Sequence, residues 1–222
     1  MPDNWKTHRR RSIRLPGYDY ASPGAYFVTV CVRGGDCLLG EVVDEEMRLN
    51  EFGRLAHDFW TQVPTHFPGV CVDAFAIMPN HLHAIIVIQS LSVVAGDVGK
   101  GAETAKGAET APLRDMTKEG DACRGEETLK GTVSALIVQA PTKKPTLGQI
   151  VAYYKYQTTV QINQLRDMPG TPFWQRNYWE HIVRNERSLN RIREYIENNP
   201  ARWAEDQLHP DASPNRFNQW QL

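Results

Sequence analysis

The chain has 222 residues, of which 41% are hydrophobic and 23% are charged, and its formal net charge is −1. This length allows one well-buried core with appendages, and the charge balance does not by itself indicate a nucleic-acid partner. No run approaches the ~20 apolar residues of a membrane span, and residues 1–14 lack the apolar core of a secretory signal. We therefore expect a soluble globular protein of the cytoplasm. None of its four cysteines (Cys31, Cys37, Cys71, Cys123) form a CxxC pair, so reduced thiols are expected rather than a zinc knuckle or disulfides.

Apolar spacing predicts the elements of the first 90 residues. In chain order they are a strand at 25–32, a hairpin at 37–50 turning at 44–46, a helix at 53–67, and strands at 70–77 and 81–88. Pro64 is expected to end or kink the helix, because proline lacks the amide hydrogen that a helix interior uses.

Residues 90–145 differ in composition from the rest of the chain. They are rich in Gly, Ala, Thr, Lys and Glu, and they contain the hexapeptide KGAETA twice in tandem at 100–111. Such a segment buries too little apolar surface to offset the entropy of ordering. We expect a flexible low-complexity insertion within a single domain of residues 1–222, with local order at most near 133–138.

Regular structure is predicted again from residue 146. Apolar residues at helical spacing predict a long helix at 146–166, and a strand at 179–183 and a helix at 188–198 with Ser188 as N-cap follow. Pro200 disfavours helical geometry at Asn199, so the last helix is expected to close there. This order matches an α+β fold with a ferredoxin-like split β-α-β sheet and an added C-terminal helix.

Two histidines, His81 and His83, stand at the head of an otherwise apolar predicted strand. Side chains alternate along a strand, so both imidazoles share one face while Leu82 points to the core. Buried imidazoles are costly unless they are bonded, and neutral imidazole is a common metal ligand. The pattern leaves open a zinc site, a non-haem iron site, or two hydrogen-bonded histidines without a metal.

The segment YIENN at 195–199 is the second candidate feature. Tyr195 and Asn199 are four residues apart and share a helix face, where they present a phenol and an amide oxygen together. An amide oxygen suits Mg²⁺ or Mn²⁺, and a tyrosine near such a cation can attack the phosphorus atom that the cation polarises. The alternative is structural, with Tyr195 packed and Asn199 in a turn before Pro200.

Together these segments resemble the HUH single-tyrosine transposases, in particular the REP-associated tyrosine transposases. MPNHLH at 78–83 is similar to the family signature MP(N/D)HxH, and YIENNP at 195–200 is similar to its YIxxNP ending. Three other segments resemble this branch: RSIRLPGYDY at 11–20, GAYFVT at 24–29 and WQRNYWEHIVR at 174–184. The resemblance does not extend to the insertion.

The resemblance implies an HUH endonuclease fold, with the C-terminal helix as the catalytic helix. His81, His83 and Asn199 would bind Mg²⁺ or Mn²⁺. Tyr195 would attack single-stranded, hairpin-forming DNA, form a 5′-phosphotyrosine bond and release a 3′-hydroxyl, as in DNA transposition. This branch is expected to act as a monomer, and exchange of the tyrosine helix between two subunits is the alternative.

Further DNA contacts are predicted from basic, polar and aromatic side chains: Arg9, Arg10, Arg11, Arg14, Lys155, Trp174, Gln175, Arg176 and Arg184. The four arginines near the start would contact phosphates or lie in a solvated, frayed terminus. Trp174 would contact DNA or pack internally. His181 is expected to have a structural role.

Three functions therefore remain to be distinguished by experiment. The first is an active tyrosine transposase, and the second is a nucleic-acid-binding module of the same fold that does not cleave. The third is a metal-dependent hydrolase in which the histidine pair activates water. The hydrolase would not need Tyr195, so Tyr195→Phe would leave it active.

Overall fold

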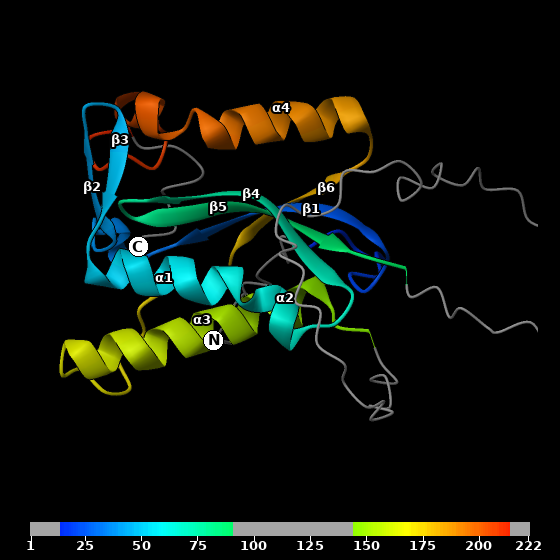
Figure 1. Ribbon diagram of the computed structural model, residues 1–222, viewed down its shortest axis with the longest axis horizontal. Helices are drawn as coiled ribbons and strands as arrows, with labels where there is room; N and C mark the ends of the chain where they lie inside the picture. Colours follow the sequence, from blue (N-terminus) through cyan, green and yellow to red (C-terminus); the bar gives the residue numbers. More distant parts are fainter. Residues whose placement is uncertain (1–13, 91–143, 214–222) are drawn as a thin grey trace, which may run out of the picture.

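The computed structural model describes residues 14–90 and 144–213 of the chain (Figure 1). The insertion predicted at 90–145 lies outside them except for residues 90, 144 and 145, so the tandem repeat and the run at 133–138 are not described. Arg9, Arg10, Arg11 and Cys123 also lie outside the described residues.

The described chain is a mixed α/β fold built on a four-stranded antiparallel sheet with the strand order β4-β5-β1-β6. Its strands are β1 (Gly24–Cys31), β4 (Val70–Met78), β5 (His81–Ile88) and β6 (Trp179–Val183). The strands predicted at 25–32, 70–77, 81–88 and 179–183 are thereby confirmed within one residue. Within the described segments, no helix combines the length and apolar character that a membrane crossing needs.

A two-stranded sheet follows β1 and stands at one end of the molecule (Figure 1). It consists of β2 (Gly40–Val43) and β3 (Glu46–Leu49). Asp44 and Glu45 form its turn with φ angles of 53° and 65°. Two consecutive residues with positive φ are typical of the tight turns that suit the twist of a hairpin.

Helices cover both faces of the main sheet (Figure 1). They are α1 (Glu51–Thr61), α2 (Val63–His66), α3 (Leu147–Leu165) and α4 (Glu186–Glu197), with short 3-10 turns η1 (Arg33–Gly35) and η2 (Pro200–Glu205). α1 and α3 lie on one face, where Trp60 meets Tyr154 edge-on with ring centroids 4.8 Å apart. α4 lies on the other face, where Leu189 and Ile196 pack against Ile85 of β5.

The helix predicted at 53–67 is interrupted near Pro64, as expected: α1 ends at Thr61, and Pro64 sits in the first turn of α2, where its missing amide hydrogen costs nothing. Two other local predictions need correction. α4 begins before Ser188, because the Asn185 side chain caps it by accepting from the Ser188 amide at 2.8 Å. α4 ends at Glu197, ahead of Pro200 as predicted, but Asn199 itself keeps helical angles (φ −62°, ψ −41°) despite the following proline.

Candidate functional site

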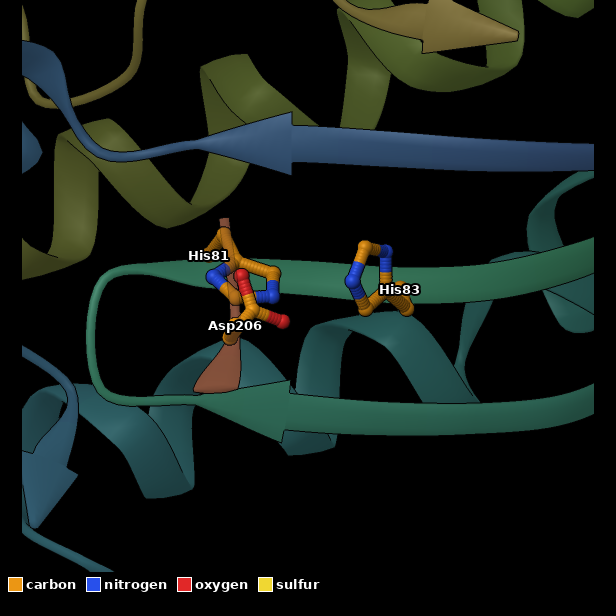
Figure 2. Close-up of side chains that lie close together, drawn as sticks. All are labelled: His81, His83 and Asp206. Carbon is orange, nitrogen blue, oxygen red and sulfur yellow. The ribbon is translucent and has the colours of Figure 1, made fainter. Parts of the chain in front are cut away.

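β5 places His81 and His83 on the face that α4 covers, and Figure 2 shows the two rings along this strand. Leu82 points into the core on the opposite face, as the alternation predicts. The His81 side chain is 0% exposed and that of His83 is 4% exposed. Both imidazoles therefore depend on bonds from neighbouring groups.

Each imidazole is oriented through its Nδ1 atom. His81 Nδ1 donates to Asn80 Oδ1 at 2.8 Å, and the Asn80 amide is itself fixed because its Nδ2 donates to the carbonyls of Gly35 and Leu208. An amide oxygen only accepts, so the proton of His81 sits on Nδ1 and the Nε2 lone pair is free. His83 Nδ1 is hydrogen bonded to Thr29 Oγ1 at 2.8 Å. Such partners commonly orient histidines that bind metals.

Burial keeps both histidines neutral. It lowers the pKa of His81 to about 3. It also lowers the pKa of His83 well below its usual value, as does the His81 ring, while Asp206 acts in the opposite direction. Neutral imidazole is the form that binds a cation.

Tyr195 reaches this pair from α4. Its hydroxyl is hydrogen bonded to His83 Nε2 at 3.1 Å, and its ring packs edge-on against Phe27 with centroids 6.1 Å apart. The residue nevertheless remains 46% exposed. Burial of the hydroxyl and the charge of Asp206 raise the pKa of Tyr195 to about 12, although a hydrogen bond from Asn199 lowers it. The phenol is therefore protonated at neutral pH.

Asn199 and Asp206 complete the group. Asn199 is 3% exposed, and its Nδ2 donates to Asp206 Oδ2 at 3.2 Å. Asp206 follows η2, and one ligand atom from each of His81, His83 and Asp206 lies within 4.8 Å of the other two (Figure 2). These three side chains can hold a metal ion. Asp206 is not among the site residues predicted from the sequence, because no residue spacing indicates where the chain returns after η2.

Two buried atoms of the group have no hydrogen-bond partner among the described residues. They are His81 Nε2 and Asn199 Oδ1. Beside them opens a cleft of about 950 Å³, whose lining includes Phe27, Thr29, Trp179, His181, Tyr195 and Arg202. Tyr195 is part of this lining, so its side chain can be reached by a ligand bound in the cleft.

Some of the residues predicted to contact DNA bond within the protein, and others are exposed to solvent. Arg14 pairs with the Glu180 carboxylate and stacks over the Tyr178 ring at 3.6 Å. Lys155 Nζ donates to three backbone carbonyls, those of Gln175, Arg176 and Asn177. Trp174 is buried and donates to Thr158 Oγ1 at 2.7 Å, in line with internal packing. Arg176 and Arg184 are exposed. A role of these residues in DNA contact stays a prediction.

Comparisons with known proteins give one close relative. No protein-family model matches the chain. Over 206 residues the chain is 38% identical to an uncharacterized protein of Haemophilus influenzae, across 92% of this chain and 95% of that protein. It is also similar to the solved structure of a REP-associated tyrosine transposase bound to a REP hairpin, with 14% identity and a TM-score of 0.45, covering 87% of this chain and 76% of that one.

Proposed function

The chain belongs to the family of the Haemophilus influenzae protein, and we propose that it is a metal-dependent tyrosine transposase that nicks and rejoins single-stranded DNA. One observation carries the proposal: the Tyr195 hydroxyl touches His83 Nε2 beside two buried atoms, His81 Nε2 and Asn199 Oδ1, that lack partners among the described residues. Leaving such an atom unpaired costs about 1–3 kcal/mol. The motifs that carry these residues resemble those of REP-associated transposases, which makes hairpin-forming DNA the substrate to test.

The donor set fits a divalent cation. His81 and His83 supply neutral nitrogens, and Asn199 Oδ1 and the Asp206 carboxylate supply oxygens of the kind that Mg²⁺ and Mn²⁺ accept. We propose His81, His83 and Asn199 as ligands, with Asp206 as a further candidate. A cation bound here would neutralise the phosphate charge and polarise the phosphorus for in-line attack.

Tyr195 supplies the nucleophile. Its oxygen forms a bond to the phosphorus atom, the bond from phosphorus to O3′ breaks, and O3′ keeps the electron pair. The phenol releases its proton to water and O3′ takes one from water, so the products are a 5′-phosphotyrosine and a free 3′-hydroxyl. Because one phosphate ester replaces another, attack by a different 3′-hydroxyl can rejoin the strand without an energy source.

The hydrogen bond of Tyr195 has a consequence for this chemistry. It occupies His83 Nε2, the atom that the proposed cation would also need, since Nδ1 is bonded to Thr29. Tyr195 must therefore leave His83 when a cation binds. Its exposure of 46%, at the edge of the cleft, leaves the side chain room to turn toward a substrate.

We also propose that the fold is the ferredoxin-like split β-α-β arrangement with α4 as the added catalytic helix. In support, β1 and β4 are joined through α1 but separated in the sheet by β5. We also propose action as a monomer, in which α4 brings Tyr195 to the histidines of its own chain.

Asp206 favours a second candidate function. Two histidines and a carboxylate are also a donor set that activates water in metal-dependent hydrolases. In that case Tyr195 would be dispensable and no covalent adduct would form. The two candidates are therefore separated by one substitution, Tyr195→Phe.

The test is a denaturing gel of single-stranded hairpin DNAs, labelled at the 5′ or the 3′ end and incubated with the protein and Mn²⁺. We expect the fragment 3′ to the nick to migrate as a protein adduct, with no adduct for Tyr195→Phe or His81→Ala. Cleavage that survives Tyr195→Phe would establish the hydrolase instead. Binding without cleavage over a broad set of hairpins would favour the non-cleaving binding module.

A further inference from the structure

An ion pair ties α4 to the edge of the sheet. Arg193 Nε donates to Asp73 Oδ1 at 2.9 Å, and Arg193 Nη2 donates to Asp73 Oδ2 at 2.6 Å. Two parallel bonds of this kind fix direction as well as distance, because the guanidinium and the carboxylate are both planar. The side chains are 38% and 21% exposed, so the pair is partly shielded from water.

Asp73 is itself held in place. It lies in the irregular part of β4, where the register with β5 shifts between Val72 and Phe75. Its Oδ1 also accepts from the Ala74 amide at 2.7 Å. Bulges of this kind re-aim a side chain, and here the carboxylate is aimed at α4.

Arg193 and Tyr195 flank the same apolar stripe. Each residue turns a helix by about 100°, and Ile192 and Ile196 mark the side of α4 that packs on the sheet. Arg193, one residue after Ile192, falls on one flank of this stripe. Tyr195, one residue before Ile196, falls on the other. A rotation of α4 that breaks the ion pair therefore also moves the Tyr195 hydroxyl relative to His83.

The apolar contacts of α4 restrain this rotation weakly. The buried apolar residues of this interface are Leu189, Ile196 and Ile85, and many of the partly buried ones around them are alanines and valines. Such contacts hold the helix on the sheet but have little directional preference. The Arg193–Asp73 ion pair therefore fixes the rotation of α4 about its axis, which the apolar contacts leave weakly restrained.

We propose that Arg193 and Asp73 are positioning residues, which set the rotation of α4 and thereby the position of the Tyr195 side chain beside the histidine pair, from which its hydroxyl turns to the substrate when a cation binds. The catalytic meaning of this inference rests on the proposed transposase function. The positioning itself does not, because the contact between Tyr195 and His83 exists without substrate.

The first test is independent of catalysis. Side-chain nitrogen spectra of protein labelled with ¹⁵N-histidine are recorded for wild type, Tyr195→Phe, Arg193→Gln and Asp73→Asn. Tyr195→Phe identifies the His83 signal that senses the hydroxyl, and both ion-pair variants should shift that signal in the same direction. Arg187→Gln, an exposed position on the same helix, serves as control and should leave the signal unchanged. A wild-type signal in both ion-pair variants would overturn the proposal.

The second test uses the rate of adduct formation at saturating hairpin DNA. Small misplacements of a reacting group reduce rates strongly, so we expect a fall of about 10- to 100-fold for Arg193→Gln and Asp73→Asn, with DNA affinity retained. If the rate, the DNA affinity and the thermal stability all fall together in these variants, the pair has a merely structural role and the inference is contradicted. If wild type forms no adduct, the transposase function fails, and the histidine spectra still decide the positioning.

Discussion

The two faces of the main sheet differ in what they bury: one carries the large apolar core and the other carries the candidate site. Beneath α1 and α3, β1 and β5 contribute Tyr26, Val28, Leu82 and Ile86 to a large apolar core that also contains Trp60. Beneath α4, the same two strands present Thr29, His81 and His83, and only a small apolar cluster holds the helix. Because side chains alternate, one pair of strands serves both faces. The large core supplies the stability that allows polar groups to be buried on the other face.

This difference predicts unequal stability effects, and the largest belongs to the core face. Trp60 is fully buried and packs against Tyr154. We expect Trp60→Ala to lower the free energy of unfolding by about 3–5 kcal/mol, through lost burial and the cavity left behind. Urea unfolding measures the change. A loss below about 1 kcal/mol would mean that the core lies elsewhere.

On the site face, His81→Leu should separate cation binding from stability. The substitution removes the unpartnered Nε2 but also the hydrogen bond to Asn80. These effects oppose each other, so we expect the free energy of unfolding without added metal to stay within about 1 kcal/mol of wild type. Calorimetry should find Mn²⁺ binding abolished. Unchanged binding would refute the proposed site, and a large destabilisation would show that His81 is needed for the fold.

Tyr195→Phe should strengthen cation binding. The phenol hydroxyl occupies His83 Nε2, so its removal frees that atom. A hydrogen bond contributes about 0.5–1.5 kcal/mol net, which corresponds to a gain in Mn²⁺ affinity of about 2- to 10-fold. Tyr156→Phe is the matched control, because Tyr156 is 66% exposed on α3. Weaker binding by Tyr195→Phe would instead make the hydroxyl a ligand.

The smallest expected effect concerns the Arg193–Asp73 pair and its pH dependence. Burial raises the pKa of Asp73, but the hydrogen bonds from Arg193 and Ala74 outweigh it, so the pKa lies below its usual value. The pair therefore stabilises the fold above the unfolded pKa of about 3.9, and this contribution is lost as pH falls through the folded value. Asp73→Asn should be less stable than wild type by up to about 1 kcal/mol at pH 7.

The difference between Asp73→Asn and wild type should shrink as the pH falls below about 4, because the unfolded carboxylate takes up a proton there and the folded one follows at lower pH. Urea unfolding of both proteins at pH 7 and at pH 3 measures it. A difference that is unchanged at pH 3 would show that the amide disturbs packing rather than charge.

Periodicity predicted the parts of the site that lie within one element. Alternation placed His81 and His83 together, and the four-residue spacing placed Tyr195 and Asn199 on one side of the C-terminal helix. It could not identify Asp206 or the Arg193–Asp73 pair, because these depend on how distant segments return to the sheet. The cap at Asn185 and the helical Asn199 were mispredicted where a neighbour or a tertiary contact outweighed the local preference.

The most direct measurement maps the covalent bond. After reaction with hairpin DNA and Mn²⁺, the adduct is digested with nuclease and trypsin, and the masses of its peptides are measured by mass spectrometry. Cleavage after Arg193 and Arg202 releases residues 194–202, which contain Tyr195 as their only tyrosine. The proposed function predicts this peptide with a 5′-phosphorylated nucleotide attached. A nucleotide on any other peptide, or DNA cleaved without an adduct, would contradict it.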